Sequence, residues 1–151
     1  MTSQAFWEQY LTETGQQRED ASYAGELQFE NTGAVGQTQL LLLLSGKKTA
    51  LFSPFDFYVI NRLPLPLTGA FYLVVDSTRE PECIIELTDV QVLPFGEVTW
   101  EMAQLEGEDA DFDAWKDKQR EYLEEEAALS GFDVNAETKL LFEKFRVVYR
   151  R

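Results

Sequence analysis

The chain has 151 residues, a formal net charge of −14, one cysteine and no histidine. This length fits a single domain that is large enough to bury a core of its own. The negative charge opposes tight binding to a long polyanion such as duplex DNA, because that binding depends on neutralising phosphates. The absence of histidine excludes Ser-His-Asp and Cys-His catalysis and histidine-ligated metal sites, which leaves carboxylates, lysine, tyrosine and hydroxyls for acid–base chemistry.

The sequence lacks the features of a secreted or membrane-anchored chain. No basic and apolar leader is present at its start, and the five consecutive leucines at 40–44 fall far short of the ~20 apolar residues of a membrane span. We therefore expect a soluble cytoplasmic protein that makes no membrane contact. Cys83 lies in an apolar run, where a lone cysteine is usually a small core residue, and no intrachain disulfide can form.

The first half of the chain predicts helices and short extended segments. Phe6, Trp7, Tyr10 and Leu11 have the spacing of one helical face, which indicates a helix over 3–13. An extended segment at 22–30 and a helix over 33–45 follow, although two glycines weaken the first turn of that helix. A strand at 49–53 ends at a proline, which has no N–H to donate, and a single helical turn at 55–62 comes next.

The second half predicts longer strands and two helices. Apolar and alternating residues indicate strands over 70–76, 82–93 and 139–149. Between the last two strands we expect a helix over 98–106, with Thr99 as its N-cap, and a helix over 112–129, with Asp111 or Asp109 as its N-cap. Strands and helices do not alternate strictly, which favours an α+β domain with a mostly antiparallel sheet.

The stretch 40–53 combines a helix end with a basic corner. An apolar block stops at Gly46, the usual residue just past a helix C-terminus, and Lys47 and Lys48 follow at the negative end of the helix dipole. Two ammonium groups held at such a corner fit an anion or ligand site. Taken alone, however, the pattern favours a helix cap with two solvated lysines over a ligand site.

An acidic run at 106–113 resembles a calcium loop only superficially. Asp109, Asp111 and Asp113 have the every-other spacing of such a loop. An EF-hand also needs a glycine at its sixth position and a glutamate at its twelfth, where this chain has Ala114 and Arg120. We therefore expect no metal site, and we expect no cofactor.

Five segments together resemble the ASCH domains, a branch of the PUA-like superfamily. They are SGKKTA at 45–50, LPLTG at 65–69, PFGEVT at 94–99, AQLEGE at 103–108 followed by Trp115, and FRVVY at 145–149. The resemblance implies a small mixed or antiparallel β-barrel of about five strands with flanking helices and a cleft between barrel and helices. It also implies that 1–151 form one domain, in which 1–30 are an N-terminal helix and a lead-in segment.

The resemblance further implies nucleoside or RNA chemistry. The superfamily includes RNA-binding modules, some ASCH members hydrolyse acylated nucleosides, and ribonuclease activity occurs in the family. A lysine, a threonine and a glutamate act in the hydrolysing members, and these positions fall on Lys48, Leu51 and Glu106. Leucine cannot be a nucleophile, and Gln119 stands where relatives often carry a histidine.

Three hypotheses follow from these residues. The first is a cleft that binds a small nucleoside-like ligand, a modified base or a short single-stranded RNA. The residues expected to line this cleft are Lys47, Lys48, Thr49, Glu106, Trp115 and Gln119. The second is a hydrolase, either a nucleoside amidohydrolase or a ribonuclease, in which Lys48 and Glu106 act with Ser53 or Thr49 as the hydroxyl.

The third hypothesis is a protein-interaction domain. Residues 101–137 include thirteen acidic and three basic side chains, a net of −10, which concentrates the acidity on the helical part of the chain. Such a face would repel structured RNA and attract a basic partner. The overall charge favours a small ligand over a long RNA, and Leu51 favours binding over hydrolysis.

Overall fold

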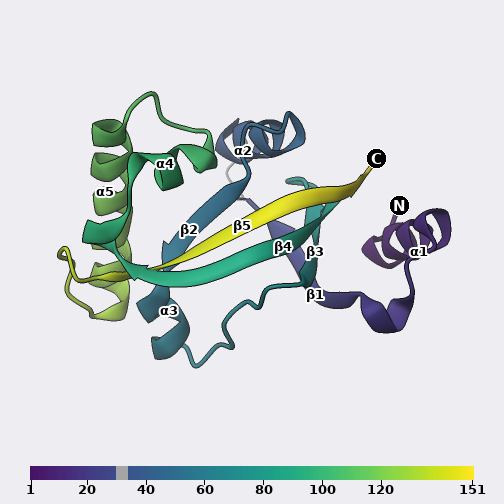
Figure 1. Ribbon diagram of the computed structural model, residues 1–151, viewed down its shortest axis with the longest axis horizontal. Coiled ribbons are helices and arrows are strands. Elements are labelled where there is room, and N and C mark those ends of the chain that lie inside the picture. The colour runs from purple at the N-terminus through teal and green to yellow at the C-terminus, as the bar shows by residue number, and fades with distance from the viewer. Residues whose placement is uncertain (30–33) are drawn as a thin grey trace.

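The computed structural model describes residues 1–29 and 34–151, which form one mixed sheet with helices packed on both of its faces (Figure 1). The strands are β1 (Ser22–Gln28), β2 (Ala50–Pro54), β3 (Ala70–Val75), β4 (Pro81–Pro94) and β5 (Lys139–Arg150). The α-helices are α1 (Ser3–Thr14), α2 (Ala34–Leu44), α3 (Phe55–Ile60), α4 (Trp100–Ala103) and α5 (Phe112–Ser130). Short 3-10 turns lie at η1 (Arg18–Asp20), η2 (Phe95–Glu97) and η3 (Gln104–Glu106).

The five strands pair in the order β1-β3-β4-β5-β2. β1 runs parallel to β3, and the other three neighbouring pairs are antiparallel. The expected α+β class with a mostly antiparallel sheet is confirmed. The pairing of the described residues leaves β1 and β2 as the outer strands and does not join them, so a closed barrel is not established.

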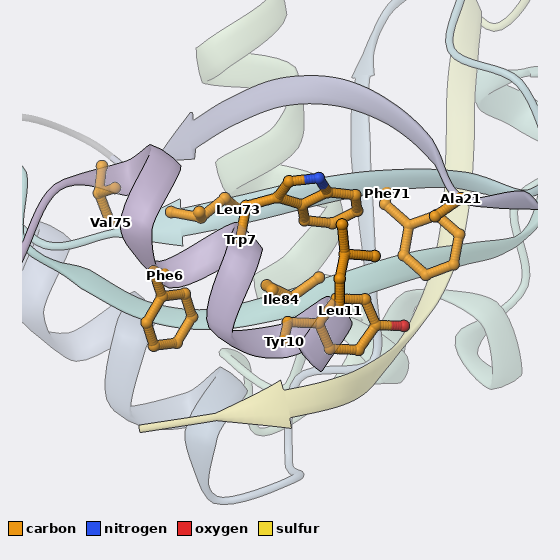
Figure 2. Close-up of a cluster of buried hydrophobic side chains, with 9 residues drawn as sticks. All are labelled: Phe6, Trp7, Tyr10, Leu11, Ala21, Phe71, Leu73, Val75 and Ile84. Atoms are coloured by element: carbon orange, nitrogen blue, oxygen red, sulfur yellow. The ribbon is translucent and has the colours of Figure 1, made fainter. Parts of the chain in front are cut away.

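Helix α1 covers one face of the sheet at the end where both termini lie (Figure 1). Its buried residues Phe6, Trp7 and Tyr10 are directed toward the sheet, as the spacing of the apolar residues predicts (Figure 2). They pack on Phe71 and Ile84, which come from β3 and β4 (Figure 2). Burying these aromatic side chains fixes the N-terminal helix to the sheet, because each removes a large apolar area from water.

Two further clusters divide the rest of the sheet. Phe52 and Phe142 stack on one face, where they meet Trp115 and Leu123 of α5. On the opposite face, Leu43 of α2 joins a cluster that includes residues of β3, β4 and β5. Because side chains alternate along a strand, one face of β2 and β5 packs against α5 and the other face lies on the side of the α2 cluster.

The helix boundaries follow their caps. The Thr99 hydroxyl accepts the Met102 N–H at the start of α4, and the Asp111 carboxylate accepts the Ala114 N–H at the start of α5. The expected helix over 98–106 is divided into α4 and η3, and the start of the expected helix at 33 lies outside the described residues. None of the helices described is long and apolar enough to cross a membrane.

Candidate functional site

The corner between α2 and β2 places its two lysines in opposite environments. Gly46 has a φ of +83° and ends the helix, and the N–H groups of Lys47 and Lys48 both donate to the Leu42 carbonyl, over 3.0 and 2.9 Å. The Lys47 side chain is exposed, whereas Lys48 retains only 3% of its accessible surface. The corner is therefore a helix cap with one solvated lysine and one buried lysine.

The Lys48 ammonium is enclosed by acceptors. It lies 3.2 Å from Oε2 of Glu108, 3.4 Å from the main-chain carbonyl of Glu106 and 3.9 Å from Oε2 of Glu106. The Phe29 ring centroid is 5.9 Å away. The ammonium therefore makes two hydrogen bonds and one longer ion pair, which keep its buried charge compensated.

The Glu106 carboxylate binds two further groups besides Lys48. Oε1 accepts the Trp115 indole N–H over 2.7 Å, and Oε2 accepts the Phe52 main-chain N–H over 3.1 Å. Phe52 belongs to β2, an outer strand whose free edge would otherwise leave this donor unpaired in the interior. Glu106 thus connects a strand edge, a helix and the buried lysine.

The turn that follows Glu106 requires glycine. Gly107 has a φ of +74°, and a Cβ at this position would lie 2.7 Å from the Lys47 carbonyl oxygen. The neighbouring Leu105 carbonyl accepts the Thr49 N–H over 2.8 Å. The η3 segment therefore packs its backbone directly on the corner, which explains the Glu-Gly pair of the 103–108 segment.

Glu108 is the second carboxylate of the site, and it is not among the residues predicted from the sequence. It hydrogen-bonds Gln39 of α2 and lies 3.3 Å from the Lys118 ammonium of α5. These three residues also line a small hollow of about 230 Å³ with Thr38 and Leu42. Its position two residues after Glu106 in an acidic run is a signal, but that run was considered only as a calcium loop and as the N-cap of the next helix.

The two carboxylates differ in acidity because their surroundings differ. Burial raises the pKa of Glu106, and Lys48 with the two N–H donors opposes that rise only in part. Burial acts in the same direction on Glu108, but Lys48, Gln39 and Lys118 together bring its pKa below the ordinary value. Of the two carboxylates, Glu108 therefore stays ionised more readily as the partner of the buried Lys48 ammonium.

A larger hollow of about 660 Å³ opens beside the same corner. It is lined by Ser45, Gly46, Lys48 and Thr49 on one side and by residues of β5, including Arg146 and Arg150, on the other. Glu106 does not line it, and its carboxylate instead lies 3.9 Å from the Lys48 ammonium. Lys48 lines this hollow, whereas its ammonium is turned toward the carboxylates of Glu106 and Glu108.

Two expected ligand residues are placed in the interior. Trp115 is 1% exposed and packs against Phe52, Phe95 and Phe112, so in this arrangement it cannot stack on a base. Gln119 is also buried, one turn further along α5. The amphipathic stripe that contained both residues is core, and Trp115 acts on the site only through its bond to Glu106.

The replacement hydroxyls are not assembled with the buried pair. Within the described residues, neither the Thr49 nor the Ser53 hydroxyl hydrogen-bonds Lys48 or Glu106. Thr49 lines the larger hollow, and Ser53 lies on the sheet face of Leu51. In residues 1–29 and 34–151, no group of three or more His, Cys, Asp and Glu side chains is placed to hold a metal ion.

These features define a class of protein, an α+β domain in which a buried lysine at a helix–strand corner is clamped by carboxylates from a following turn. The family model of the ASCH domain matches residues 25–149, and the chain belongs to this PUA-like family. The expected family is thereby confirmed.

Solved structures agree with this assignment. An ASCH domain from Lactobacillus crispatus is 28% identical, with 98% of this chain and 94% of that chain covered and a TM-score of 0.87. Protein EF3133 from Enterococcus faecalis is 25% identical over 97% and 88% of the chains, with a TM-score of 0.82. A ZmASCH mutant protein from Zymomonas mobilis, 18% identical over 84% and 69% with a TM-score of 0.50, shares the fold alone. No protein with a curated functional record matches the chain.

Proposed function

We propose that the protein binds a small nucleoside-like ligand, or the end of a short single-stranded RNA, in the hollow beside the α2–β2 corner. The observation that carries this proposal is that Lys48 and Thr49 line a hollow of about 660 Å³ together with β5. This volume lies within the roughly 300–1,000 Å³ typical of ligand pockets. The lining combines apolar side chains with a few polar groups, which suits a base and a ribose.

The charge around the hollow supports a ligand with one or a few phosphates. Residues 139–151 contain five basic side chains and one acidic side chain, in a chain whose net charge is −14. Arg146 and Arg150 of this segment line the hollow, and the exposed Lys47 lies at its corner. A long RNA would also meet the acidic helices, so a short ligand fits the charge distribution better.

Lys48 has a positioning role in this proposal. Its ammonium is held by Glu106 and Glu108, so the charge is not free to bind an anion directly. Fixing the side chain also fixes the main chain of the corner, where Lys48 and Thr49 face the hollow. The clamp therefore sets the shape of the binding surface.

Binding is favoured over hydrolysis by the position that the family resemblance assigns to the nucleophile. That position is Leu51, whose side chain packs with the α2 cluster. The hydroxyls on either side, at Thr49 and Ser53, make no hydrogen bond to Lys48 or Glu106 in the described residues. Among residues 1–29 and 34–151, the buried pair thus has no hydroxyl bonded to it that it could activate.

Calorimetric titration with cytidine, N-acetylcytidine and a short oligonucleotide tests the proposal. The variants Thr49→Val and Arg150→Met should weaken binding at least several-fold, because both residues line the hollow. Lys139→Met is the matched control, since it removes one charge from an exposed position at the other end of β5. Equal affinities of Arg150→Met and Lys139→Met for the ligand would reject this binding site. Release of acetate from N-acetylcytidine would show that the protein is a hydrolase and would contradict the proposal that it only binds its ligand.

A further inference from the structure

Glu143 is a buried carboxyl group in the middle of the sheet. It lies on β5, where its backbone pairs with Leu51 of β2 on one side and Val90 of β4 on the other. The residue retains 6% of its accessible surface. Phe142 faces the α5 cluster, so Glu143 points to the opposite face, the one that α2 covers further along.

This carboxyl group has no polar partner among the side chains that the structure describes. Among the described residues, no hydrogen bond or ion pair reaches its oxygens, although buried carboxyls are normally paired. The adjacent Lys144 does not compensate it, because its ammonium lies 5.8 Å from the Phe142 ring centroid on the other face. A buried acid without a partner is consistent with a group that a ligand completes.

A buried hydroxyl, that of Ser53, lies on the same face. It is close enough to the Tyr58 phenol to lower that phenol's pKa, but no well-aligned hydrogen bond satisfies it within the part of the chain that the structure describes. Ser53 is two residues from Leu51 along β2, and Leu51 is the cross-strand neighbour of Glu143. Such diagonal neighbours lie about 7–8 Å apart, within the span of one small planar group.

Two tyrosines complete the surroundings. Burial raises the pKa of the Tyr58 and Tyr72 phenols, the Ser53 hydroxyl opposes that rise at Tyr58, and the nearby Glu143 charge adds to it in both. The two tyrosines come from α3 and β3, and among residues 1–29 and 34–151 they are the titratable groups that face Glu143, since its neighbours on β2 and β4 are Leu51 and Val90. The group is therefore one acid among hydroxyls, aromatic rings and aliphatic side chains.

We infer that Glu143, Ser53, Tyr58 and Tyr72 form a second binding site, which takes a ligand group with two adjacent N–H donors. A carboxylate accepts such a pair through both oxygens, as it does from a guanidinium. The phenol rings offer aromatic surface to a planar or cationic group. A guanidinium and the N1–H and N2–H edge of guanine share this chemistry. The site has no residue in common with the hollow at the corner, so it stands independently of the proposed function.

The charge of Glu143 supports this assignment. Burial raises its pKa to about 7, so the group loses its proton near neutral pH. Only the ionised form presents acceptors at both oxygens. Affinity for an N–H donor pair should therefore be about tenfold higher at pH 8 than at pH 6, because the ionised fraction changes by that factor across a pKa of about 7.

The test uses the full chain and calorimetric titration at pH 8 with agmatine, guanosine, inosine and butylamine. Binding of agmatine but not butylamine identifies a guanidinium, and binding of guanosine but not inosine, which lacks the 2-amino group, identifies the base edge. Glu143→Gln should weaken either interaction at least tenfold, and Ser53→Ala several-fold. Glu137→Gln, at an exposed position, is the matched control and should bind as the wild type does.

Two outcomes overturn the inference. One is the absence of heat for both agmatine and guanosine at millimolar concentration, with the protein shown to be folded by its thermal transition. The other is a Glu143→Gln variant that binds with unchanged affinity or with an unchanged ratio between pH 6 and pH 8. Because Arg150→Met should leave this binding intact, failure at this site is distinguishable from failure of the corner hollow.

Discussion

The indole N–H of Trp115 donates to Oε1 of Glu106 over 2.7 Å, from inside the buried face of α5. The same carboxylate caps the free Phe52 N–H at the edge of β2. A tryptophan expected to stack on a base is instead the group that orients the acid. A core residue of α5 therefore holds the Glu106 carboxylate in place, so the rigidity of the site depends on how α5 packs against the sheet.

Replacing Trp115 by phenylalanine should destabilise the protein by about 2–3 kcal/mol. The substitution keeps an aromatic ring but leaves Oε1 of a buried carboxylate without its donor, and unsatisfied buried acceptors are expensive. Urea unfolding measures the change. Trp100→Phe is the control, because Trp100 also packs near Phe112 without bonding Glu106. Equal losses in the two variants would mean that ring volume, and not the hydrogen bond, sets the effect.

Lys48 and its neighbour Lys47 should respond differently to the same change. Lys48→Met leaves Glu106 and Glu108 without their buried counter-ion, for which a loss of about 3–5 kcal/mol is expected. Lys47→Met alters an exposed side chain and should change the free energy of unfolding by less than about 0.5 kcal/mol. Chemical denaturation of both variants decides the point. A small effect of Lys48→Met would show that the pair contributes little to folding.

The raised pKa of Glu143 predicts a pH dependence of stability. Burial raises this pKa from 4.5 to about 7. Between these values the folded state holds a proton that the unfolded state has lost, so stability falls as pH rises through this window and is constant above it. The penalty at pH 8 is about 3 kcal/mol, at about 1.4 kcal/mol for each pKa unit.

Glu143→Gln should remove that dependence. The variant should unfold at higher urea than the wild type at pH 8 and at similar urea at pH 4.5, because glutamine resembles the protonated acid. Paired unfolding curves at the two pH values measure this directly. A stability difference that does not change with pH would assign the effect to packing and contradict the raised pKa.

Two glycines with similar backbone conformations, one at the corner and one at the end of α5, allow the effect of a missing Cβ to be compared. Gly107 and Gly131 have φ values of +74° and +81°, but only Gly107 lacks space for a Cβ, which would lie 2.7 Å from the Lys47 carbonyl oxygen. Gly131→Ala should therefore cost about 1–2 kcal/mol, from the left-handed conformation alone. Gly107→Ala should cost more and should also weaken ligand binding at the hollow. Equal losses in thermal unfolding would show that η3 can move away from the corner.

Local patterns predict most of the elements, because their causes are local. The apolar spacing of 3–13 and 112–129 and the glycine at 46 give helix limits close to those observed. The alternation in 139–149 likewise gives β5. The parallel pairing of β1 with β3 was not predicted, since it depends on contacts between segments distant in sequence.

The site was predictable only where one short segment carries it. Lys48 and Glu106 follow from their motifs, and the structure brings them to 3.9 Å. Glu108 and Glu143 were missed because acidic residues in charged or alternating runs are usually solvent-exposed, and their burial is set by residues far away in the chain. Trp115 and Gln119 were placed in the cleft although their stripe, read alone, indicates core.

The strand order has a consequence for how the molecule is made. β5 lies between β4 and β2, so the strand that is synthesised after the other four is an interior strand of the sheet. Until it emerges, β2 has no neighbour to pair with and the buried lysine corner has no sheet behind it. A chain interrupted before residue 139 would therefore leave β2 and one edge of β4 unpaired, and unpaired strand edges favour aggregation.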